Sequence, residues 1–255
     1  MNLTSRFLAA AKAAAIHLFC SGVVALLAAT LVFGIWYPPP YDQLAGGREL
    51  FCLMLAVDLV CGPLLTFVLF NPTKSSSELL LDLGVVALLQ VLALTYGLVT
   101  VSAARPLFLV LEVDRFKVIA GPALDKAAVA ALPPGVRPSW WSGPATVSIR
   151  TPKDESERQS VLIESVQGGR DYAERPDFYL PYDAIAAVNS LERAKPITAF
   201  LQKQPSQQSA ALELASDKNL ALLELWYLPV IAKQDWVAVL NKQGQIQGFL
   251  KGDGF

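Results

Sequence analysis

Three uninterrupted apolar segments occupy the first 105 residues of this chain, and they decide what it can fold into. The segments cover residues 13–36, 50–70 and 79–101. A helix rises about 1.5 Å per residue, so about 20 apolar residues are enough to cross a hydrocarbon layer of about 30 Å. The sequence therefore predicts a membrane protein with three transmembrane α-helices in residues 1–105.

Most of the charged residues follow the third apolar segment. Of 21 Lys and Arg and 22 Asp and Glu, only five of each precede residue 106. The remaining chain of about 150 residues is long enough to bury a core of its own, so we predict that residues 106–255 form one soluble domain. The net charge of −1 gives no overall field that would attract nucleic acid, and nucleic-acid binding is not expected.

The distribution of histidine and cysteine restricts the chemistry of the soluble domain. The single histidine and all three cysteines lie in the apolar segments, and residues 106–255 contain neither residue type. A Ser-His-Asp triad, a thiol nucleophile and the usual zinc sites are therefore excluded from that domain. No Gly-x-x-x-x-Gly-Lys phosphate loop is present either. We expect no enzyme activity, no cofactor and no metal site.

The ends of the apolar segments predict the membrane topology. The first segment is too long for the apolar region of a signal peptide, so we expect an uncleaved anchor, ended by Pro38, Pro39 and Pro40. The loop Pro38–Glu49 should be extended and exposed. Residues 71–78 are a short connection, so the second and third helices should form an antiparallel hairpin. Basic residues favour a cytoplasmic N-terminus and a C-terminal domain on the outer side, which in a Gram-negative cell is the periplasm: Arg6, Lys12 and Lys74 lie on one side, and Arg48 and Arg105 on the other.

Polar residues inside the predicted spans are candidates for function, since an ionisable group there costs about 2.5–3.5 kcal/mol. Asp58 in the second span and Gln90 in the third fall at nearly the same depth, so they are expected to hydrogen-bond across the hairpin. Gly62 allows another helix to approach closely, and Pro63 removes one helical hydrogen bond. Residues 58–63 should therefore form a kinked, partly polar surface within the bilayer.

A second polar layer is predicted nearer the cytoplasm, where His17 and Asp82 lie at similar depths and are expected to form an ion pair. Three roles stay open for both layers: locking the helices together, holding the helix of another protein, and relaying protons or ions. An intramembrane aspartyl protease is excluded, because Asp58 and Asp82 would differ by about 12 Å in depth and could not share a proton.

The soluble domain is predicted to be α+β with an antiparallel sheet. Trp140 and Trp141 lie in a loop, where they are either core residues or, if exposed, residues that contact the membrane interface or a partner protein. One long strand or two short ones are expected at residues 107–120, and further strands at 146–150, 221–231, 235–240 and 245–250. Helices are expected at 127–132, 154–166, 181–193, 196–203 and 206–216.

Several ordered motifs resemble the TfpX/TfpZ family of type IV pilin accessory proteins. The resemblance covers residues 36 to about 120 and is diffuse beyond them. Its main elements are Trp36-Tyr37-Pro38-Pro39-Pro40-Tyr41, Leu44-Ala45-Gly46-Gly47-Arg48-Glu49-Leu50, Val57-Asp58, Gly62-Pro63-Leu64-Leu65-Thr66, Phe70-Asn71-Pro72-Thr73-Lys74, Glu78-Leu79, Leu81-Asp82-Leu83, Ala104-Arg105-Pro106 and Glu112-Val113-Asp114-Arg115-Phe116.

This resemblance implies an inner-membrane protein that binds and stabilises its cognate major type IV pilin before pilus assembly, as a pilin-specific chaperone. A pilin awaiting assembly has one long apolar helix with a charged N-terminus and a globular head outside the membrane. The expected partners are therefore that pilin and the lipid bilayer. The hypothetical client-binding residues are His17, Asp58, Gly62, Pro63, Asp82 and Gln90. The alternative is a membrane-anchored periplasmic ligand-binding or sensor protein, which would need a defined pocket in its soluble domain.

Overall fold

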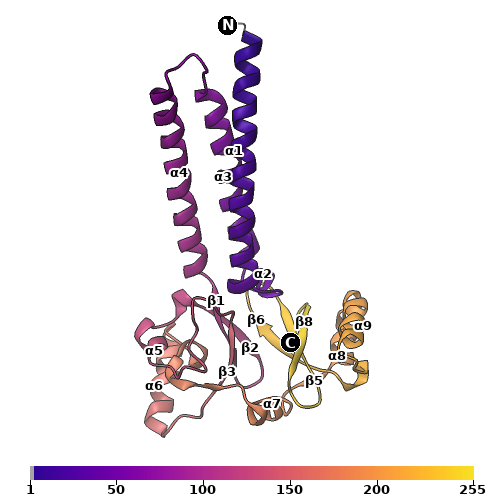
Figure 1. The fold of residues 1–255 in the computed structure, drawn as a ribbon. Coiled ribbons are helices and arrows are strands. Elements are labelled where there is room, and N and C mark those ends of the chain that lie inside the picture. Colours follow the sequence, from indigo (N-terminus) through magenta and orange to yellow (C-terminus); the bar gives the residue numbers. More distant parts are fainter. Residues whose placement is uncertain (1–2) are drawn as a thin grey trace. The chain divides into compact units, whose positions relative to one another are not determined.

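The computed structural model describes residues 3–255, which form two compact units (Figure 1). The first unit contains the chain up to Pro38 together with Gly46–Ala104. The second contains Arg105–Phe255 and, in addition, the short segment Pro39–Ala45 from between the first two apolar helices.

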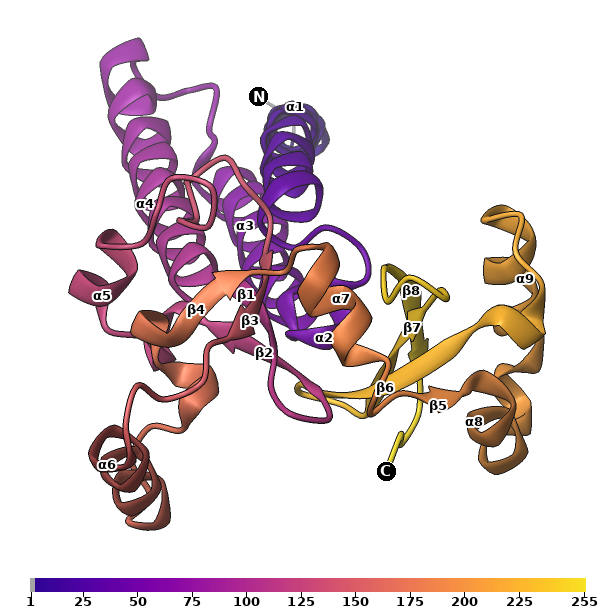
Figure 2. The ribbon, with the colours of Figure 1, turned by 90° about the horizontal axis from the view of Figure 1, so that it is seen from below.

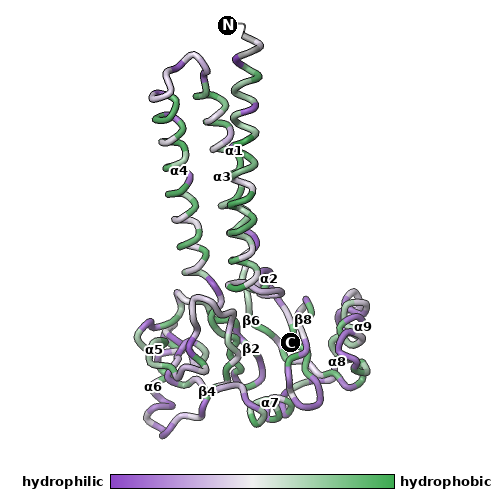
Figure 3. The backbone as a smooth tube through the Cα atoms, viewed as in Figure 1, coloured by the Kyte–Doolittle hydropathy of each residue, from purple (hydrophilic) through white to green (hydrophobic). Residues whose placement is uncertain are grey.

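The first unit consists of three long helices. α1 (Leu3–Leu31) continues into the π-helical turn η1 (Val32–Trp36), and α3 (Gly47–Leu69) and α4 (Ser76–Ala103) follow. Each is long and apolar enough to cross a membrane, and the tube in Figure 3 is predominantly hydrophobic along all three. The prediction of three transmembrane helices is confirmed, and the chain is a membrane protein.

α3 is the central helix of this unit and packs against both α1 and α4. Edge-to-face aromatic pairs, Phe7 with Phe67 and Phe33 with Phe51, join the first helix to α3. The outward faces stay apolar, since at most 11% of each span's most hydrophobic stretch is buried within the protein. Such surface is stable only in a hydrocarbon environment.

The end of the first helix is packed against protein. Trp36 and Tyr37 are 1% and 0% exposed, and the Tyr37 hydroxyl donates to the Val101 carbonyl near the end of α4 at 3.0 Å. Gly47 lies against the Tyr37 ring, where a Cβ would overlap the ring carbons. These aromatic residues therefore hold the three helices together where α1 ends, α3 begins and α4 ends.

The segment after the first helix differs from the extended, exposed loop that the sequence predicts. Residues Tyr41–Leu44 form the short helix α2, and Leu44 is fully buried in a core of the second unit. The Leu44 carbonyl accepts a hydrogen bond from the Lys233 backbone N–H at 3.0 Å, and the Tyr41 ring packs edge-on against Phe249. The expectation fails because Tyr41 and Leu44 are apolar anchors one helical turn apart, and the second unit offers them a place to be buried.

An eight-stranded sheet forms the centre of the second unit. Its strands are labelled in Figure 2. Its order is β4-β3-β1-β2-β6-β7-β8, with β5 paired to β6. β1 with β3 and β2 with β6 are parallel, and the other pairs are antiparallel. The strands are β1 (Pro106–Leu111), β2 (Phe116–Ala120), β3 (Ala145–Ile149), β4 (Tyr179–Pro181), β5 (Lys195–Pro196), β6 (Trp226–Ile231), β7 (Trp236–Leu240) and β8 (Ile246–Lys251).

Helices and three apolar clusters complete this unit. The first cluster packs Ile197 and Phe200 against β6 and β7, the second contains Leu44 and Trp236, and the third surrounds Phe108 and Val147. The helices are α5 (Lys126–Ala130), α6 (Glu155–Val166), α7 (Ala184–Ser190), α8 (Ile197–Lys203) and α9 (Gln208–Asp217).

The α+β fold class is confirmed, with two differences of detail. The sheet is mixed, because the parallel pairs bring together strands that are distant in the sequence. The expected helix at 181–193 is shortened to α7, which begins after Asp183 as N-cap, because Tyr179–Pro181 is used as strand β4. The expected helix at 154–166 forms with Asp154 as its N-cap.

The burial of Leu44 gives a prediction about stability. Replacing Leu44 with alanine should lower the free energy of unfolding of the second unit by about 2–5 kcal/mol, because it leaves a cavity in a packed core. Trp236 belongs to the same core, so denaturant unfolding of the detergent-solubilised chain, followed by tryptophan fluorescence, can measure the change.

The matched control is Leu223→Ala, since Leu223 is 82% exposed in the same unit. It should change the free energy of unfolding by less than about 0.5 kcal/mol. Equal effects of the two substitutions would show that residues 39–45 are not part of this core.

Candidate functional site

The candidate site is a mainly apolar cavity among the three spanning helices, with a few polar groups in its lining. Asp58, Gly62 and Thr66 follow one another at intervals of four residues, so they share one face of α3. α1 contributes His17 and Ser21 at this level. The cavity has a volume of about 180 Å³, and its lining includes His17, Ser21 and Val24 from α1, Met54 and Asp58 from α3, and Gln90 and Val91 from α4.

Gln90 is the hub of the hydrogen bonds at this site. Its side-chain nitrogen donates to the Asp58 backbone carbonyl at 3.0 Å and to the Ser21 hydroxyl at 3.4 Å. Its side-chain oxygen contacts Nε2 of His17. Because an amide oxygen can only accept, Nε2 is the ring nitrogen that donates. The other ring nitrogen, Nδ1, is 2.5 Å from the Thr66 hydroxyl. One side chain thus joins all three spans.

Gly62 leaves space for the Gln90 side chain. It is buried, and a Cβ at this position would overlap the Gln90 side-chain amide. The close helix approach predicted at Gly62 is therefore made by α4 of the same chain. Pro63 lies within α3, which remains one continuous helix from Gly47 to Leu69. The space beside Gly62 is filled, so a client helix would have to contact the cavity elsewhere.

The Asp58 carboxylate is the one acidic group of the cavity. The predicted contact between Asp58 and Gln90 is present, but it uses the Asp58 backbone carbonyl. Within residues 3–255, the Asp58 carboxylate makes no hydrogen bond or ion pair. It is partly buried and lies 11 residues before the end of α3, about 17 Å along the helix axis. A carboxylate at that depth is costly, which makes it a candidate binding group.

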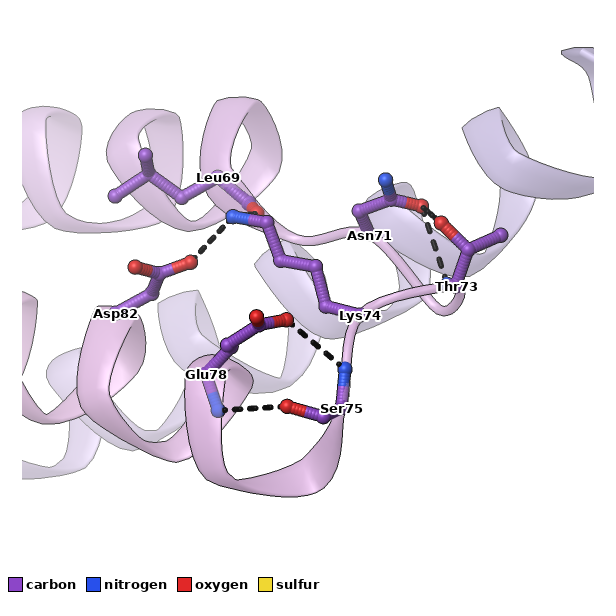
Figure 4. Close-up of polar contacts among 7 residues, drawn as sticks. All are labelled: Leu69, Asn71, Thr73, Lys74, Ser75, Glu78 and Asp82. Atoms are coloured by element: carbon purple, nitrogen blue, oxygen red, sulfur yellow. Dashed lines mark hydrogen bonds and ion pairs between the residues drawn. The ribbon is translucent and has the colours of Figure 1, made fainter.

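Asp82 is held at the turn between α3 and α4 by a different partner from the one predicted. Lys74 Nζ lies 2.5 Å from the Asp82 carboxylate and also donates to the Leu69 carbonyl (Figure 4). A reciprocal capping box between Ser75 and Glu78 begins α4 beside this pair.

The predicted ion pair between His17 and Asp82 is therefore wrong. The apolar segment starts at residue 13, whereas α1 begins at Leu3, so His17 lies about 15 Å further from the start of the helix than the apolar segment indicates. At that level it meets Thr66 and Gln90, while the turn supplies a full cation, Lys74, to Asp82.

Trp140 and Trp141 lie in an exposed loop of the second unit. Their side chains are 50% and 71% exposed, so the interpretation as core residues is wrong. The interpretation as a contact surface stays open.

A larger cavity of about 980 Å³ lies at the end of β1 and β3 in the second unit. Its three arginines, Arg115, Arg150 and Arg158, are each paired with an acidic side chain. Arg150 forms two hydrogen bonds with Glu157, which lower the pKa of that carboxyl to about 2. Burial, followed by the nearby charge of Asp171, raises the pKa of Glu112. In residues 3–255 no group of three His, Cys, Asp or Glu side chains is placed to hold a metal ion.

Two residues of the hydrogen-bond network at the membrane cavity were missed from the sequence, of which Ser21 also lines the cavity. Ser21 and Thr66 each contribute a hydroxyl to the network around Gln90 and His17. The signal for Thr66 was available, because it lies eight residues after Asp58 and thus on the same helix face. Ser21 lies four residues after His17 on α1 and could have been found in the same way.

Comparison with known proteins gives a consistent assignment. The family model described as fimbrial assembly protein FimB matches residues 5–46. The fimbrial assembly protein of serogroup I from Dichelobacter nodosus is 34% identical over 254 residues, and the match covers 98% of each chain. The serogroup E1 protein of the same organism is 33% identical over 254 residues, again with 98% of each chain covered.

A further relative from Dichelobacter nodosus, the fimbrial assembly protein of serogroups C1 and C2, is 42% identical over 114 residues. That match covers 45% of this chain and 87% of the relative. No solved structure is significantly similar to the chain. With two relatives above 30% identity along almost its whole length, the chain belongs to the FimB family of fimbrial assembly proteins.

Proposed function

We propose that this protein is an inner-membrane accessory protein that binds and stabilises its cognate major type IV pilin before pilus assembly. The observation that carries the proposal is the Asp58 carboxylate, which faces a cavity among three spans without a partner among the described residues. Membership of a fimbrial assembly family and the sequence resemblance to TfpX/TfpZ pilin accessory proteins support a pilus subunit as the client.

The arrangement of the helices supports the binding of another helix. α3 packs against both neighbours, and residues of α1 and α4 line the cavity on either side of it. A client helix entering between α1 and α4 would contact Val24 and Val91 through its apolar side chains. A polar or cationic group of that helix would then pair with Asp58 and remove the cost of the lone carboxylate.

The two predicted polar layers now have different roles in the proposal. Asp82 already has a cation, Lys74, and so stabilises the turn. Gln90, His17 and Gly62 are engaged within the chain and shape the cavity. Asp58 is left as the residue that contacts the client. The proposal needs no catalytic step, no cofactor and no metal.

The proposed orientation has the N-terminus in the cytoplasm and the second unit in the periplasm. Three spans place the two ends of the membrane unit on opposite sides. The connection 39–45 belongs to the second unit, so the end of α1 and the end of α4 face the same compartment. Lys74, with Arg6 and Lys12, favours the cytoplasm for the opposite side.

Replacing Asp58 with asparagine tests the binding site. It keeps the shape of the side chain but removes the charge, so the loss of about 1–2 kcal/mol of interaction should weaken pilin binding about 5- to 30-fold. Steady-state pilin, measured by quantitative immunoblotting of cell membranes, should fall while the accessory protein keeps its normal level.

The matched control is Thr95→Val in α4. Thr95 is exposed, and its hydroxyl bonds only the Val91 carbonyl of its own helix. Pilin abundance should be unchanged in this variant. If Asp58→Asn also leaves pilin at the wild-type level, the Asp58 assignment is rejected.

Labelling of introduced cysteines tests the orientation. Val166 in α6 is 79% exposed, and Ser77 in the first turn of α4 is also exposed. In cells with a permeabilised outer membrane, an impermeant maleimide should modify a Val166→Cys protein at once and a Ser77→Cys protein only after the inner membrane is disrupted. The reverse pattern would place the second unit in the cytosol and overturn the proposal.

A further inference from the structure

The loop containing Trp140 and Trp141 presents two large aromatic side chains to the surroundings of the second unit. At 50% and 71% exposure they stand out from the other tryptophans of this unit, Trp226, which is partly buried, and Trp236, which is 7% exposed. An exposed tryptophan pair is costly in water and favourable at a membrane surface, where the indole ring is amphipathic in the same way as the interface.

Local hydrogen bonds fix the loop in its conformation. The Ser139 backbone N–H donates to the Ser142 hydroxyl at 2.9 Å, and that hydroxyl donates to the Ser139 carbonyl at 3.2 Å. The Trp141 backbone N–H donates to the Ser139 hydroxyl at 3.2 Å. The tryptophans are therefore carried by a closed turn, which presents their rings without an additional ordering cost.

Arg105 connects this turn to the point where the chain leaves the membrane. Its guanidinium donates to the Ser139 carbonyl at 2.8 Å and to the Trp140 carbonyl at 3.1 Å, and it lies 5.7 Å from the centre of the Trp140 ring. Arg105 is 8% exposed, so this contact is part of the folded unit.

The position of Arg105 in the chain limits how far the loop can lie from the end of α4. α4 ends at Ala103, and consecutive Cα atoms are 3.8 Å apart, so Arg105 lies within about 7.6 Å of the last residue of the span in any orientation of the second unit. The Ser139 and Trp140 carbonyls are one arginine side chain away from that point. The turn therefore lies close to the end of α4.

We propose that residues 139–142 form an interfacial lipid anchor, in which Trp141 and Trp140 insert into the headgroup layer of the leaflet where α4 ends. Arg105 positions the turn for this contact through the two carbonyls. The anchor gives the second unit a second attachment to the bilayer, beside the covalent one at the end of α4. This role is independent of the client-binding cavity.

Quenching by brominated lipids tests the anchor in the full-length chain. The protein is reconstituted into vesicles of phosphatidylcholine and phosphatidylglycerol whose acyl chains carry bromine close to the headgroup. The lipid-quenched part of the tryptophan emission should fall about two-fold in Trp141→Phe, since the most exposed indole is then missing. Trp226→Phe, which removes a partly buried strand residue of the same unit, should leave that part unchanged.

Iodide quenching and added pilin separate the alternatives. The difference in emission between the wild type and Trp141→Phe is the contribution of Trp141. In vesicles without pilin, this contribution should be protected from quenching by aqueous iodide. If this emission is quenched by iodide and not by brominated lipid, the anchor is overturned. If shielding from iodide appears only when pilin is reconstituted with the chain, the loop contacts the client and the lipid assignment is overturned.

Discussion

The arrangement of the three helices in the membrane unit depends on the hydrogen bonds that the Gln90 side chain makes within the bilayer. In hydrocarbon no water is available to a side-chain amide, so each of its groups must find a partner in the protein. Gln90 bonds the Asp58 carbonyl and Ser21 through its nitrogen and contacts His17 through its oxygen. Because these partners lie on α3 and α1, a single residue of α4 fixes the relative positions of three helices. The absence of a side chain at Gly62 makes this contact possible.

The same hydrogen-bond network does not include the Asp58 carboxylate. The donors of Gln90 are used by the Asp58 carbonyl and by Ser21, and Lys74 is committed to Asp82, so the Asp58 carboxylate has no partner within the described chain. Its cost is tolerable if a second protein supplies the missing group. Under the proposed function, this division separates two roles: internal polar groups set the shape of the bundle, and the Asp58 carboxylate is the group that would bind a client.

The connection between the first two spans contributes to the core of the second unit. Leu44 belongs to the connection between two spans, yet it is packed with residues of β6, β7 and β8. The second unit can therefore be complete only after the first two spans have been connected correctly. This arrangement ties the folding of the second unit to the correct insertion of the first two spans.

The sequence predicted those features that rest on long, periodic patterns. The three spans, the helix capped by Asp154 and the C-terminal hairpin strands follow directly from apolar periodicity and cap residues. Features set by tertiary contacts could not be predicted in this way. The burial of Leu44 and the parallel pairing of β1 with β3 join segments distant in the chain, and the partner of Asp82 depended on a helix start that hydropathy alone placed ten residues too late.

Site-specific photocrosslinking tests the central claim most directly. A photoreactive phenylalanine derivative is placed at Val24, which lines the cavity, or at Leu81, which is 69% exposed on α4 and does not line it. In piliated cells the account predicts a pilin adduct from position 24, absent from position 81 and lost when Asp58 is also replaced by asparagine. Pilin adducts of equal yield from both positions, or an adduct at position 24 that persists without the Asp58 carboxylate, would contradict it.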